Sequence, residues 1–383
     1  MKAVGLIVEY NPFTNGHLYH LQKAKEITNA DLLIGVISPS FVQRGEPAII
    51  SKEKRVKIAL EAGIDIVIEL PFIYAVENAD FFAFGALNLL NDLGVTEIVF
   101  GSETGDTQEF LKKYNFSSIV QPHLDFLIKD FMKEGLSYPS AMNKALKEID
   151  SFQLETPNDI LGFAYKKIID QYNLPIKIHT IKRNADYKDE NLNNLASASA
   201  LRKAIKENRN IDKYTPFSNI KDFHYLDDYF DLLKNIIIMS SPEELATYHL
   251  VNEGIEYLFK KKILESNSME EFIKNCISKR YTAARIKRII IHILAKTNKQ
   301  ESISILKNKP PYVRILGINK KGEEYLKLKR KDIVVPVLNR FEGKRYPLLN
   351  LERRTTYLYY INSKDKNKHY EEELYLYPIR KME

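Results

Sequence analysis

The sequence predicts an α/β protein in which a parallel sheet is followed by a mainly helical part with a small β-containing C-terminal segment. In the first half of the chain, short apolar segments alternate with helical patterns. Each apolar segment is hydrophobic along its whole length, as strands buried on both faces are. Strands that alternate with helices in this way form a parallel sheet with helices on both sides.

The expected elements follow from apolar runs and from helix start and stop residues. Ser51 is the expected N-cap of a helix over Lys52–Ala62, and Gly63 is its expected stop. The expected strands of the first half are Ala3–Glu9, Leu32–Ser38, Ile66–Leu70, Glu97–Phe100 and Pro175–Lys182. The other expected helical segments are Gly16–Asn29, Ala79–Leu93, Phe110–Ile149, Ile160–Tyr172 and Ser197–Lys206.

The second half has a different pattern. From Asp222 to Lys299, apolar residues recur at spacings of three and four, which indicates helices. Short strands are expected at Tyr312–Ile318, Ile333–Leu338 and Thr355–Ile361. We therefore expect one domain over residues 1–210 and a second, basic and mainly helical region over residues 211–383.

The charge differs between the two parts. Residues 1–200 contain 20 of the 57 Lys and Arg and 26 of the 50 Asp and Glu, a balance of −6. The remainder therefore carries +13, within a net charge of +7. Such asymmetry favours a polyanionic partner for the second half, although a solvated basic surface explains it equally well.

Composition also bounds the compartment. Cys276 is the single cysteine, so the chain can form no internal disulfide and offers no cysteine pair to zinc. The apolar run in Met1–Tyr10 is too short for a secretion signal, and no segment approaches the roughly 18 apolar residues of a membrane span. We expect a cytoplasmic protein without membrane contact, and the sequence predicts no protein partner.

The most informative segment, Thr14-Asn15-Gly16-His17, joins the first expected strand to the first expected helix. A helix N-terminus presents free backbone N–H groups and the positive end of the helix dipole, so it attracts phosphate. Gly16 lets a phosphate approach closely. His17, and His20 on the same helix face, can donate to phosphate oxygens. The alternative is an ordinary turn with a surface histidine, which a Gly-His pair alone would favour.

A second anion-binding segment is expected at Ala196–Arg202. Small hydroxyl residues are followed there by an arginine at a helix start, and Ser199 and Arg202 are the expected donors. A capped helix with a surface arginine is the alternative. The position of this segment, late in the same α/β domain as Thr14–His17, favours phosphate binding.

Three single residues complete the expected site. Gly101 follows the fourth strand, and ligands of open α/β sheets lie beyond the carboxyl ends of strands. Asn158 begins a helix, and Arg183 closes a strand where its guanidinium could reach a phosphate or adenine. The alternatives are a turn glycine, a helix cap and a solvated arginine.

The basic residues of the second half are expected to bind RNA. Arg285 and Arg288 stand at helical spacing near Tyr281. Cations fit phosphates, and aromatic rings stack on unpaired bases. A solvated face with core tyrosines is the alternative. The other basic and aromatic candidates are Lys279, Arg280, Lys287, Lys327, Lys329, Arg330, Lys331, Arg340, Lys344, Arg345, Tyr346, Arg353, Arg354 and Tyr357.

The Thr14–His17 segment resembles the (H/T)xGH motif of the HIGH nucleotidyltransferase superfamily, which includes phosphopantetheine and nicotinamide mononucleotide adenylyltransferases. The longer segment Glu9–His20 (EYNPFTNGHLYH) resembles the narrower tRNA(Met) cytidine acetate ligase family, which usually has His in place of Thr14. Ala196–Arg202 is similar to the ISSTxxR motif of the superfamily, with Ala198 in place of a serine.

The resemblance implies a Rossmann-like nucleotidyltransferase domain that binds ATP and acetate, forms acetyl-adenylate and acetylates the wobble cytidine of elongator tRNA(Met). Catalytic roles fall to His17 and His20. The implied ATP-binding residues are Ile7, Val8, Glu9, Tyr10, Asn11, Pro12, Phe13, Thr14, Asn15, Gly16, His17, Leu18, Tyr19, His20, Gly101, Asn158, Arg183, Ser199 and Arg202.

Other chemistries find less support. The chain has no GxxxxGK[ST] motif and no GxGxxG after a strand. No histidines and carboxylates show metal-ligand spacing, so no metal ligands are expected, although Mg²⁺ accompanying ATP needs few protein ligands. An adenylyltransferase acting on a small phosphorylated substrate is the second hypothesis, and a non-catalytic RNA-binding protein with a vestigial nucleotide fold is the third.

Overall fold

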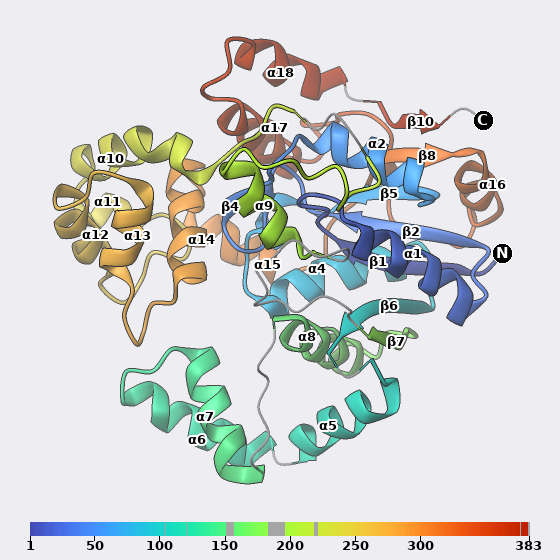
Figure 1. Cartoon of the computed structure of the whole chain (residues 1–383), viewed down its shortest axis with the longest axis horizontal. Helices are drawn as coiled ribbons and strands as arrows, with labels where there is room; N and C mark the ends of the chain where they lie inside the picture. Colours follow the sequence, from blue (N-terminus) through green and yellow to red (C-terminus); the bar gives the residue numbers. More distant parts are fainter. Residues whose placement is uncertain are drawn as a thin grey trace.

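The structure, a computed structural model, describes residues 1–103, 105–119, 121–150, 157–182, 196–217, 221–375 and 377–381. A large sheet runs through the centre with helices on both faces (Figure 1). The parallel strands of the first half are β1 (Ala3–Val8), β2 (Leu32–Ile37), β5 (Ile66–Glu69), β6 (Glu97–Ser102) and β7 (Lys177–Lys182). Their order in the sheet is β5-β2-β1-β6-β7, which confirms the predicted α/β class. The chain first adds β2 and β5 on one side of β1 and then β6 and β7 on the other, so the direction of strand addition reverses beside β1.

The second half of the chain adds strands to the same sheet. β8 (Val313–Asn319) pairs antiparallel with β5 and covers its edge. β10 (Ile379–Lys381) and β9 (Val337–Leu338) pair parallel with β8. The strand predicted at Tyr312–Ile318 is confirmed as β8, whereas only the last two residues of the predicted strand Ile333–Leu338 form β9.

Helices of the first half bury the two faces of the sheet. Ser51 caps α2 by accepting a hydrogen bond from the Lys54 backbone N–H at 3.3 Å, and Gly63 ends that helix with a φ of 108°, as predicted. One face is covered by α1 (Asn15–Thr28), α2 (Lys52–Ala62) and α9 (Ala198–Lys206). The other is covered by α4 (Ala79–Asp92) and α8 (Pro157–Gln171).

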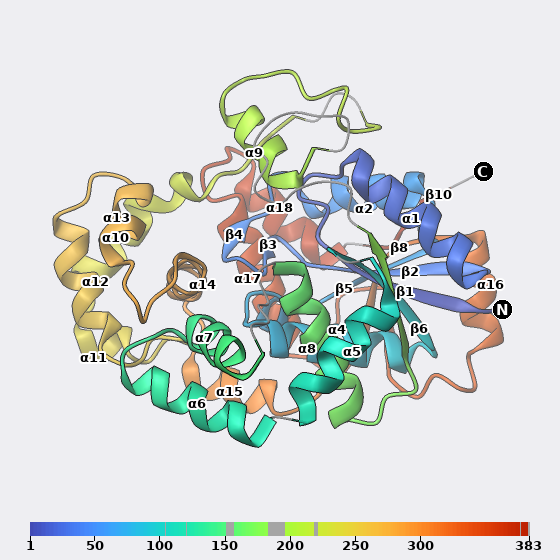
Figure 2. The ribbon, with the colours of Figure 1, turned by 60° about the horizontal axis from the view of Figure 1, so that its bottom comes forward.

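Between β6 and β7 the chain forms a helical arm. Its first helix packs beside β7, and the next two lie away from the sheet (Figures 1 and 2). The predicted helical stretch Phe110–Ile149 is divided into α5 (Thr107–Ile119), α6 (Gln121–Lys133) and α7 (Tyr138–Asp150). The Ser137 backbone N–H donates to the Lys279 carbonyl at 2.7 Å, so the turn between α6 and α7 touches the loop before α14.

The helical part predicted after residue 222 is present as a bundle beside the sheet (Figure 1). Its elements are η1 (Leu226–Tyr229), α10 (Phe230–Met239), α11 (Pro242–Leu245), α12 (Ile255–Leu264), α13 (Met269–Cys276), α14 (Ala283–Leu294) and α15 (Lys299–Leu306). The remaining elements are β3 (Phe41–Val42), β4 (Glu46–Pro47), α3 (Phe72–Ala75), α16 (Lys320–Leu328), α17 (Leu348–Tyr359), α18 (Lys366–Glu372) and η2 (Glu373–Tyr375). Of the helices in the described ranges, none has the length and apolar character needed to cross a membrane.

The strand predicted at Thr355–Ile361 is wrong, because residues 355–359 form the last turns of α17. Threonine and tyrosine favour strands when only local preference counts. Here tertiary packing decides, since Thr355, Thr356, Leu358 and Tyr359 are buried together at helical spacing. The Tyr359 hydroxyl donates to the Ala48 carbonyl at 2.7 Å, and this hydrogen bond holds α17 against the first half of the chain.

A buried ion cluster joins the C-terminal elements to the sheet. Lys52 Nζ lies 2.8 Å from a Glu69 oxygen and 3.0 Å from a Glu373 oxygen. Arg314 Nη1 lies 2.9 Å from Glu69 and 2.6 Å from Glu373. The four side chains are 1–3% exposed and come from α2, β5, β8 and η2. Burial opposes ionisation, yet Lys52 and Arg314 hold the pKa of Glu373 at about 2.

We predict that Glu373→Gln lowers the free energy of unfolding by about 3–5 kcal/mol, because removing one partner leaves buried cations without compensation. Chemical denaturation at neutral pH measures this change. Glu372→Gln is the matched control, since Glu372 pairs with Lys368 at the surface, at 3.7 Å. It should cost less than about 1 kcal/mol. Equal costs for the two variants would show that the buried cluster contributes nothing specific.

Candidate active site

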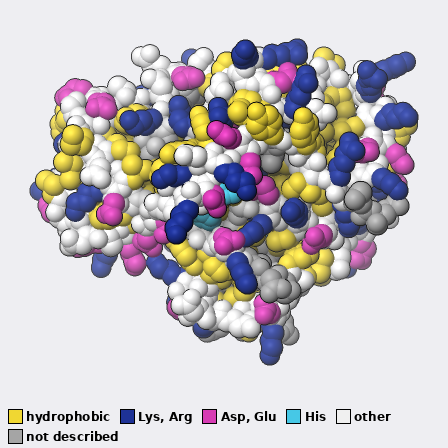
Figure 3. Space-filling view, turned by 90° about the horizontal axis from the view of Figure 1, so that it is seen from above, with side chains coloured by type: hydrophobic (Ala, Val, Ile, Leu, Met, Phe, Trp, Pro, Cys, Tyr) yellow, Lys and Arg dark blue, Asp and Glu magenta, His cyan; other side chains and the backbone are white. Residues whose placement is uncertain are grey.

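A cleft of about 1800 Å³ opens beyond the carboxyl ends of β1 and β6. This is where the strand order reverses, the usual ligand position in open α/β sheets. The strand ends, α8, α9, the arm and α14 all contribute side chains to its walls. In the space-filling view, histidine lies at the bottom of a central hollow, with basic and acidic side chains gathered around it (Figure 3). The fold therefore provides a polar cleft at its switch point.

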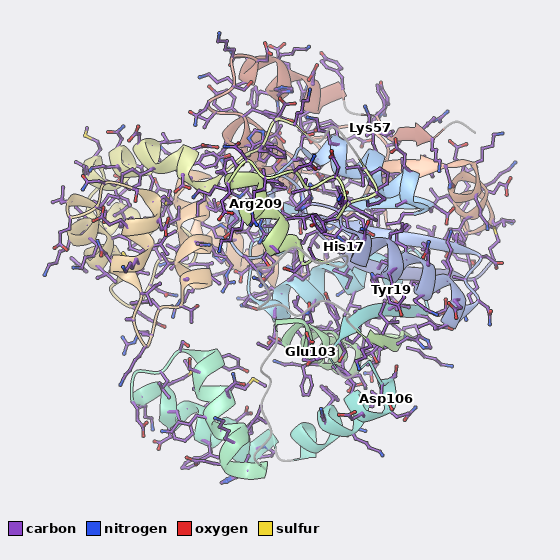
Figure 4. The ribbon with its side chains drawn as sticks, in the orientation of Figure 1. His17, Tyr19, Lys57, Glu103, Asp106 and Arg209 are labelled. Atoms are coloured by element: carbon purple, nitrogen blue, oxygen red, sulfur yellow. The ribbon has the colours of Figure 1, made fainter. Side chains whose placement is uncertain are left out.

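The Thr14–His17 segment forms the start of α1, as predicted. Thr14 is the N-cap, and its hydroxyl oxygen accepts from the His17 backbone N–H at 3.3 Å. The Thr14 backbone N–H donates to His17 Nδ1 at 3.0 Å, which completes a capping box. Because Nδ1 accepts, a neutral His17 ring carries its proton on Nε2. His17 and Tyr19, both labelled in Figure 4, come from the first turns of α1 and line the cleft.

Other residues of the predicted segment hold this helix start in place. The Asn15 backbone N–H and side-chain amide donate to the Tyr214 and Lys213 carbonyls, each at 3.0 Å. Phe13 is buried, and its ring centroid lies 5.4 Å from that of Phe217. The predicted residues that line the cleft are Ile7, Val8, Glu9, Tyr10, Asn11, Thr14, Gly16, His17, Tyr19, His20, Gly101, Asn158, Ser199 and Arg202. The predicted residues Pro12, Phe13, Asn15 and Leu18 do not line it.

Arg55 of α2 organises the strand ends beneath the cleft. Its guanidinium is fully buried and donates to the Glu9 carbonyl at 3.0 Å, the Ser38 carbonyl at 2.9 Å and the Ile50 carbonyl at 3.3 Å. It also donates to the Pro39 carbonyl. The Glu9 carbonyl follows β1, and those of Ser38 and Pro39 follow β2, so one cation fixes the loops that leave both strands.

The second predicted anion segment meets the first. Ser197 caps α9, and its hydroxyl lies 2.9 Å from that of Ser199. Arg202 Nη1 donates to the Asn11 carbonyl at 2.7 Å, so α9 approaches the loop that precedes Thr14. The structure thus brings Ser199, Arg202 and His17 to one cleft from positions far apart in the sequence.

His20 has a different environment from His17. Its Nε2 donates to the Val99 carbonyl at 3.1 Å. Loss of hydration lowers the pKa of His20 to about 4, although this hydrogen bond acts in the opposite direction. The ring is therefore neutral at pH 7, with Nδ1 as an acceptor. In this arrangement His20 supports the floor of the cleft and has no spare N–H for a phosphate.

Of the three remaining predicted residues, Gly101 and Asn158 line the cleft. Gly101, near the end of β6, lines the cleft. Asn158 lies in the first turn of α8 and also lines the cleft. Its buried amide nitrogen has no hydrogen-bond partner within the part of the chain that is described. A buried donor of this kind is suited to a hydrogen bond with a ligand. Arg183 lies outside the described residues.

Several charged residues of the cleft were not predicted as part of the nucleotide site. Arg44 and Glu46 belong to the β3–β4 hairpin, which follows β2 in the chain, and both line the cleft. Arg280, Arg285 and Arg288 belong to α14 and the loop before it. The sequence marks the last three as basic, but no local pattern places them at the nucleotide corner. No group of three or more His, Cys, Asp or Glu in the described ranges has a metal-binding arrangement.

Comparisons with known proteins show the family and the fold to which the chain is similar. The sequence model of the family described as HIGH Nucleotidyl Transferase matches residues 1–373. A protein of Oceanobacillus iheyensis named tRNA(Met) cytidine acetate ligase is 39% identical over 98% of each chain. The crystal structure of Thermotoga maritima TmcAL without ligand is 32% identical, covers 99% of each chain and has a TM-score of 0.91. The same T. maritima protein bound with alpha-thio ATP is 31% identical over the whole of both chains, with a TM-score of 0.89.

We predict that the ring of His20 does not titrate between pH 5.5 and 8, because its pKa lies near 4. Nitrogen-detected NMR of the histidine rings measures this, and the signal lost in His20→Asn assigns it. The neutral tautomer with hydrogen on Nε2 should be seen throughout this range. A midpoint near the ordinary value of 6.5 would contradict the prediction.

Proposed function

Because the chain belongs to the HIGH nucleotidyl transferase family, and within it to the tRNA(Met) cytidine acetate ligases, we propose that it activates acetate with ATP and acetylates a tRNA cytidine. The observation that carries the proposal is the corner where α1 begins. There the N-terminal turn of α1, with His17, and Arg202 of α9 line the same cleft at the switch point of the sheet.

The first step is the attack of an acetate oxygen on the α-phosphorus of ATP. A new O–P bond forms, the bond to the β-phosphate oxygen breaks, and pyrophosphate leaves. Negative charge grows on the α-phosphate in this step. The α1 dipole and the Nε2–H of His17 stabilise that charge, and Gly16 allows the phosphate to approach the backbone. Ser199 and Arg202 hold the departing pyrophosphate.

In the second step the exocyclic amine of the wobble cytidine of elongator tRNA(Met) attacks the acyl carbon of acetyl-adenylate. The new bond is an amide, AMP leaves, and the amine loses one proton. Acetate alone is a poor acyl donor, and adenylation supplies the leaving group. Much of the acceleration comes from holding the two reactants in contact.

RNA reaches the nucleotide corner along α14 in this proposal. Arg280, Arg285 and Arg288 line the same cleft as His17, so the basic residues nearest the chemistry come from the second half. Arg280 is exposed, and Tyr138 of the arm lines the cleft as an exposed ring. Such a wall suits an anticodon loop whose base is splayed out toward the adenylate. Residues 327–331 do not line this cleft and would at most contact distant parts of the RNA.

The remaining expectations follow from the same chemistry. We propose that Mg²⁺ enters with ATP and is held mainly by the phosphates, since this ion needs few protein ligands. We also propose that the protein acts in the cytoplasm, where the proposed tRNA substrate is used in translation. The division at residue 210 stays a prediction.

The decisive experiment is the exchange of labelled pyrophosphate into ATP. Exchange that depends on acetate, followed by acetylcytidine formation on elongator tRNA(Met), supports the ligase. Exchange that requires a phosphorylated metabolite would support an adenylyltransferase of the phosphopantetheine or nicotinamide mononucleotide type instead. Binding of RNA without binding of ATP would support the third hypothesis.

We predict that His17→Ala lowers the rate of acetate-dependent exchange by about 100- to 1000-fold, because it removes one donor to the charge that develops in the transition state. The affinity for tRNA should stay within about twofold of the wild type. Exchange kinetics and a filter-binding assay measure the two effects. A near-normal exchange rate in this variant would remove His17 from the mechanism.

We also predict that Arg280→Ala raises the KM for tRNA by about 5- to 30-fold, because one contact to phosphate or to an unpaired base is lost. Acetate-dependent exchange without tRNA is the internal control and should keep its wild-type rate. If exchange fell as much as acetylation did, Arg280 would act at ATP and the proposed RNA path would be wrong.

A further inference from the structure

The β3–β4 hairpin joins the nucleotide corner to α14. At its turn Gly45 has a φ of 72°, and a Cβ added there would lie 2.3 Å from the Arg288 backbone nitrogen. Only glycine fits this contact. The Gln43 backbone N–H donates to a Glu9 carboxylate oxygen at 2.9 Å, so the same hairpin is also fixed to the end of β1.

Glu46 of this hairpin lies between two cations from different parts of the chain. One carboxylate oxygen pairs with Nζ of Lys287 on α14. The other lies 3.9 Å from Nε of Arg202 on α9, which is beyond hydrogen-bond distance. Burial opposes ionisation of Glu46, yet Lys287 and Arg202 keep its pKa below the ordinary value. Glu46 is therefore a carboxylate that either cation could hold.

The present arrangement leaves Arg202 available for a ligand. Its Nη1 donates to the Asn11 carbonyl, and Lys287 rather than Arg202 makes the close contact with Glu46. Without Lys287, the carboxylate would have Arg202 as its nearest remaining cation in this trio. It would then compete with phosphate for the same guanidinium.

Lys287 itself does not reach the cleft. Among the residues that the structure describes, Ala284, Arg285 and Arg288 of α14 line it, and Lys287 does not. The side-chain partner of Lys287 among the described residues is Glu46, which lines the cleft, so we expect Lys287 to act on a nucleotide through that carboxylate.

We propose that Lys287 is a positioning residue that engages Glu46 and so keeps Arg202 free to bind the pyrophosphate end of ATP. The inference rests on the proposed function, because it assigns the triphosphate to Arg202. It makes the helical half of the chain a participant in the first half-reaction, before any RNA binds.

The test uses the full-length protein without tRNA. Lys287→Met should raise the KM for ATP in acetate-dependent exchange by about 5- to 20-fold, the effect of redirecting one charge interaction in a partly shielded site. The maximal rate of exchange should change by less than about twofold. Lys287→Arg should restore the KM, because the guanidinium can hold Glu46 in the same way. Lys262→Met, which breaks a surface pair with Glu265 at 2.6 Å, is the matched control.

The double variant separates positioning from folding. Glu46→Gln should return the KM of Lys287→Met to the wild-type value or below, because the competing carboxylate is gone. A purely structural pair would behave differently: Glu46→Gln would raise the KM as much as Lys287→Met does, and the double variant would be no better. That result, or an unchanged KM in Lys287→Met, would overturn the proposal.

Calorimetric binding of a non-hydrolysable ATP analogue distinguishes the two levels of inference. If the wild type binds the analogue but shows no acetate-dependent exchange, the proposed ligase activity fails. The positioning role still stands in that case if Lys287→Met weakens binding of the analogue and Glu46→Gln restores it. If all variants bind equally, the positioning role fails whatever the reaction is.

Discussion

The cleft depends on one buried cation, Arg55. Its guanidinium gathers the carbonyls at the ends of β1 and β2, where two loops leave the sheet in different directions. One loop leads to Thr14 and His17, and the other leads to the β3–β4 hairpin with Glu46. A buried charge is costly unless its donors are satisfied, and carbonyl oxygens satisfy these. The position of both loops is therefore set by the same group, which is why the donors of α1 and the carboxylate of the hairpin face one cleft.

The second half of the chain is fixed to this frame by polar as well as apolar contacts. The cluster of Lys52, Glu69, Arg314 and Glu373 balances two cations with two carboxylates, so their desolvation is offset by close pairing. Glu352 lies beside it, and burial, followed by repulsion from Glu69, raises its pKa well above the ordinary value. One of its oxygens accepts from the Phe72 backbone N–H at 2.6 Å, so this side chain also links the C-terminal helix α17 to the end of β5. The C-terminal elements thus complete the edge of the nucleotide sheet.

The two histidines of the motif differ in which ring nitrogen is hydrogen-bonded, and this gives them different roles. In His17, which lines the cleft, the capping box occupies Nδ1, so a neutral ring carries its proton on Nε2. In His20 the carbonyl of Val99 occupies Nε2, and the low pKa keeps the ring neutral. We infer that His17 carries the contact to phosphate, whereas His20 holds the start of α1 against β6. The division follows from hydrogen bonding, since both are histidines on one helix face.

The sequence by itself determined the alternating strands and helices of the first half, the caps at Ser51 and Gly63, and the strand–helix junction at Thr14–His17, because each depends on residues near one another in the chain. Tertiary structure alone decided the helix at 355–359, the pairing of β8 with β5, and the meeting of Glu46 with Lys287, which are 241 residues apart. Local preference favoured a strand in the first case and gave no information in the other two. Contacts of such separation form only when the whole chain has folded, so no segment of sequence encodes them alone.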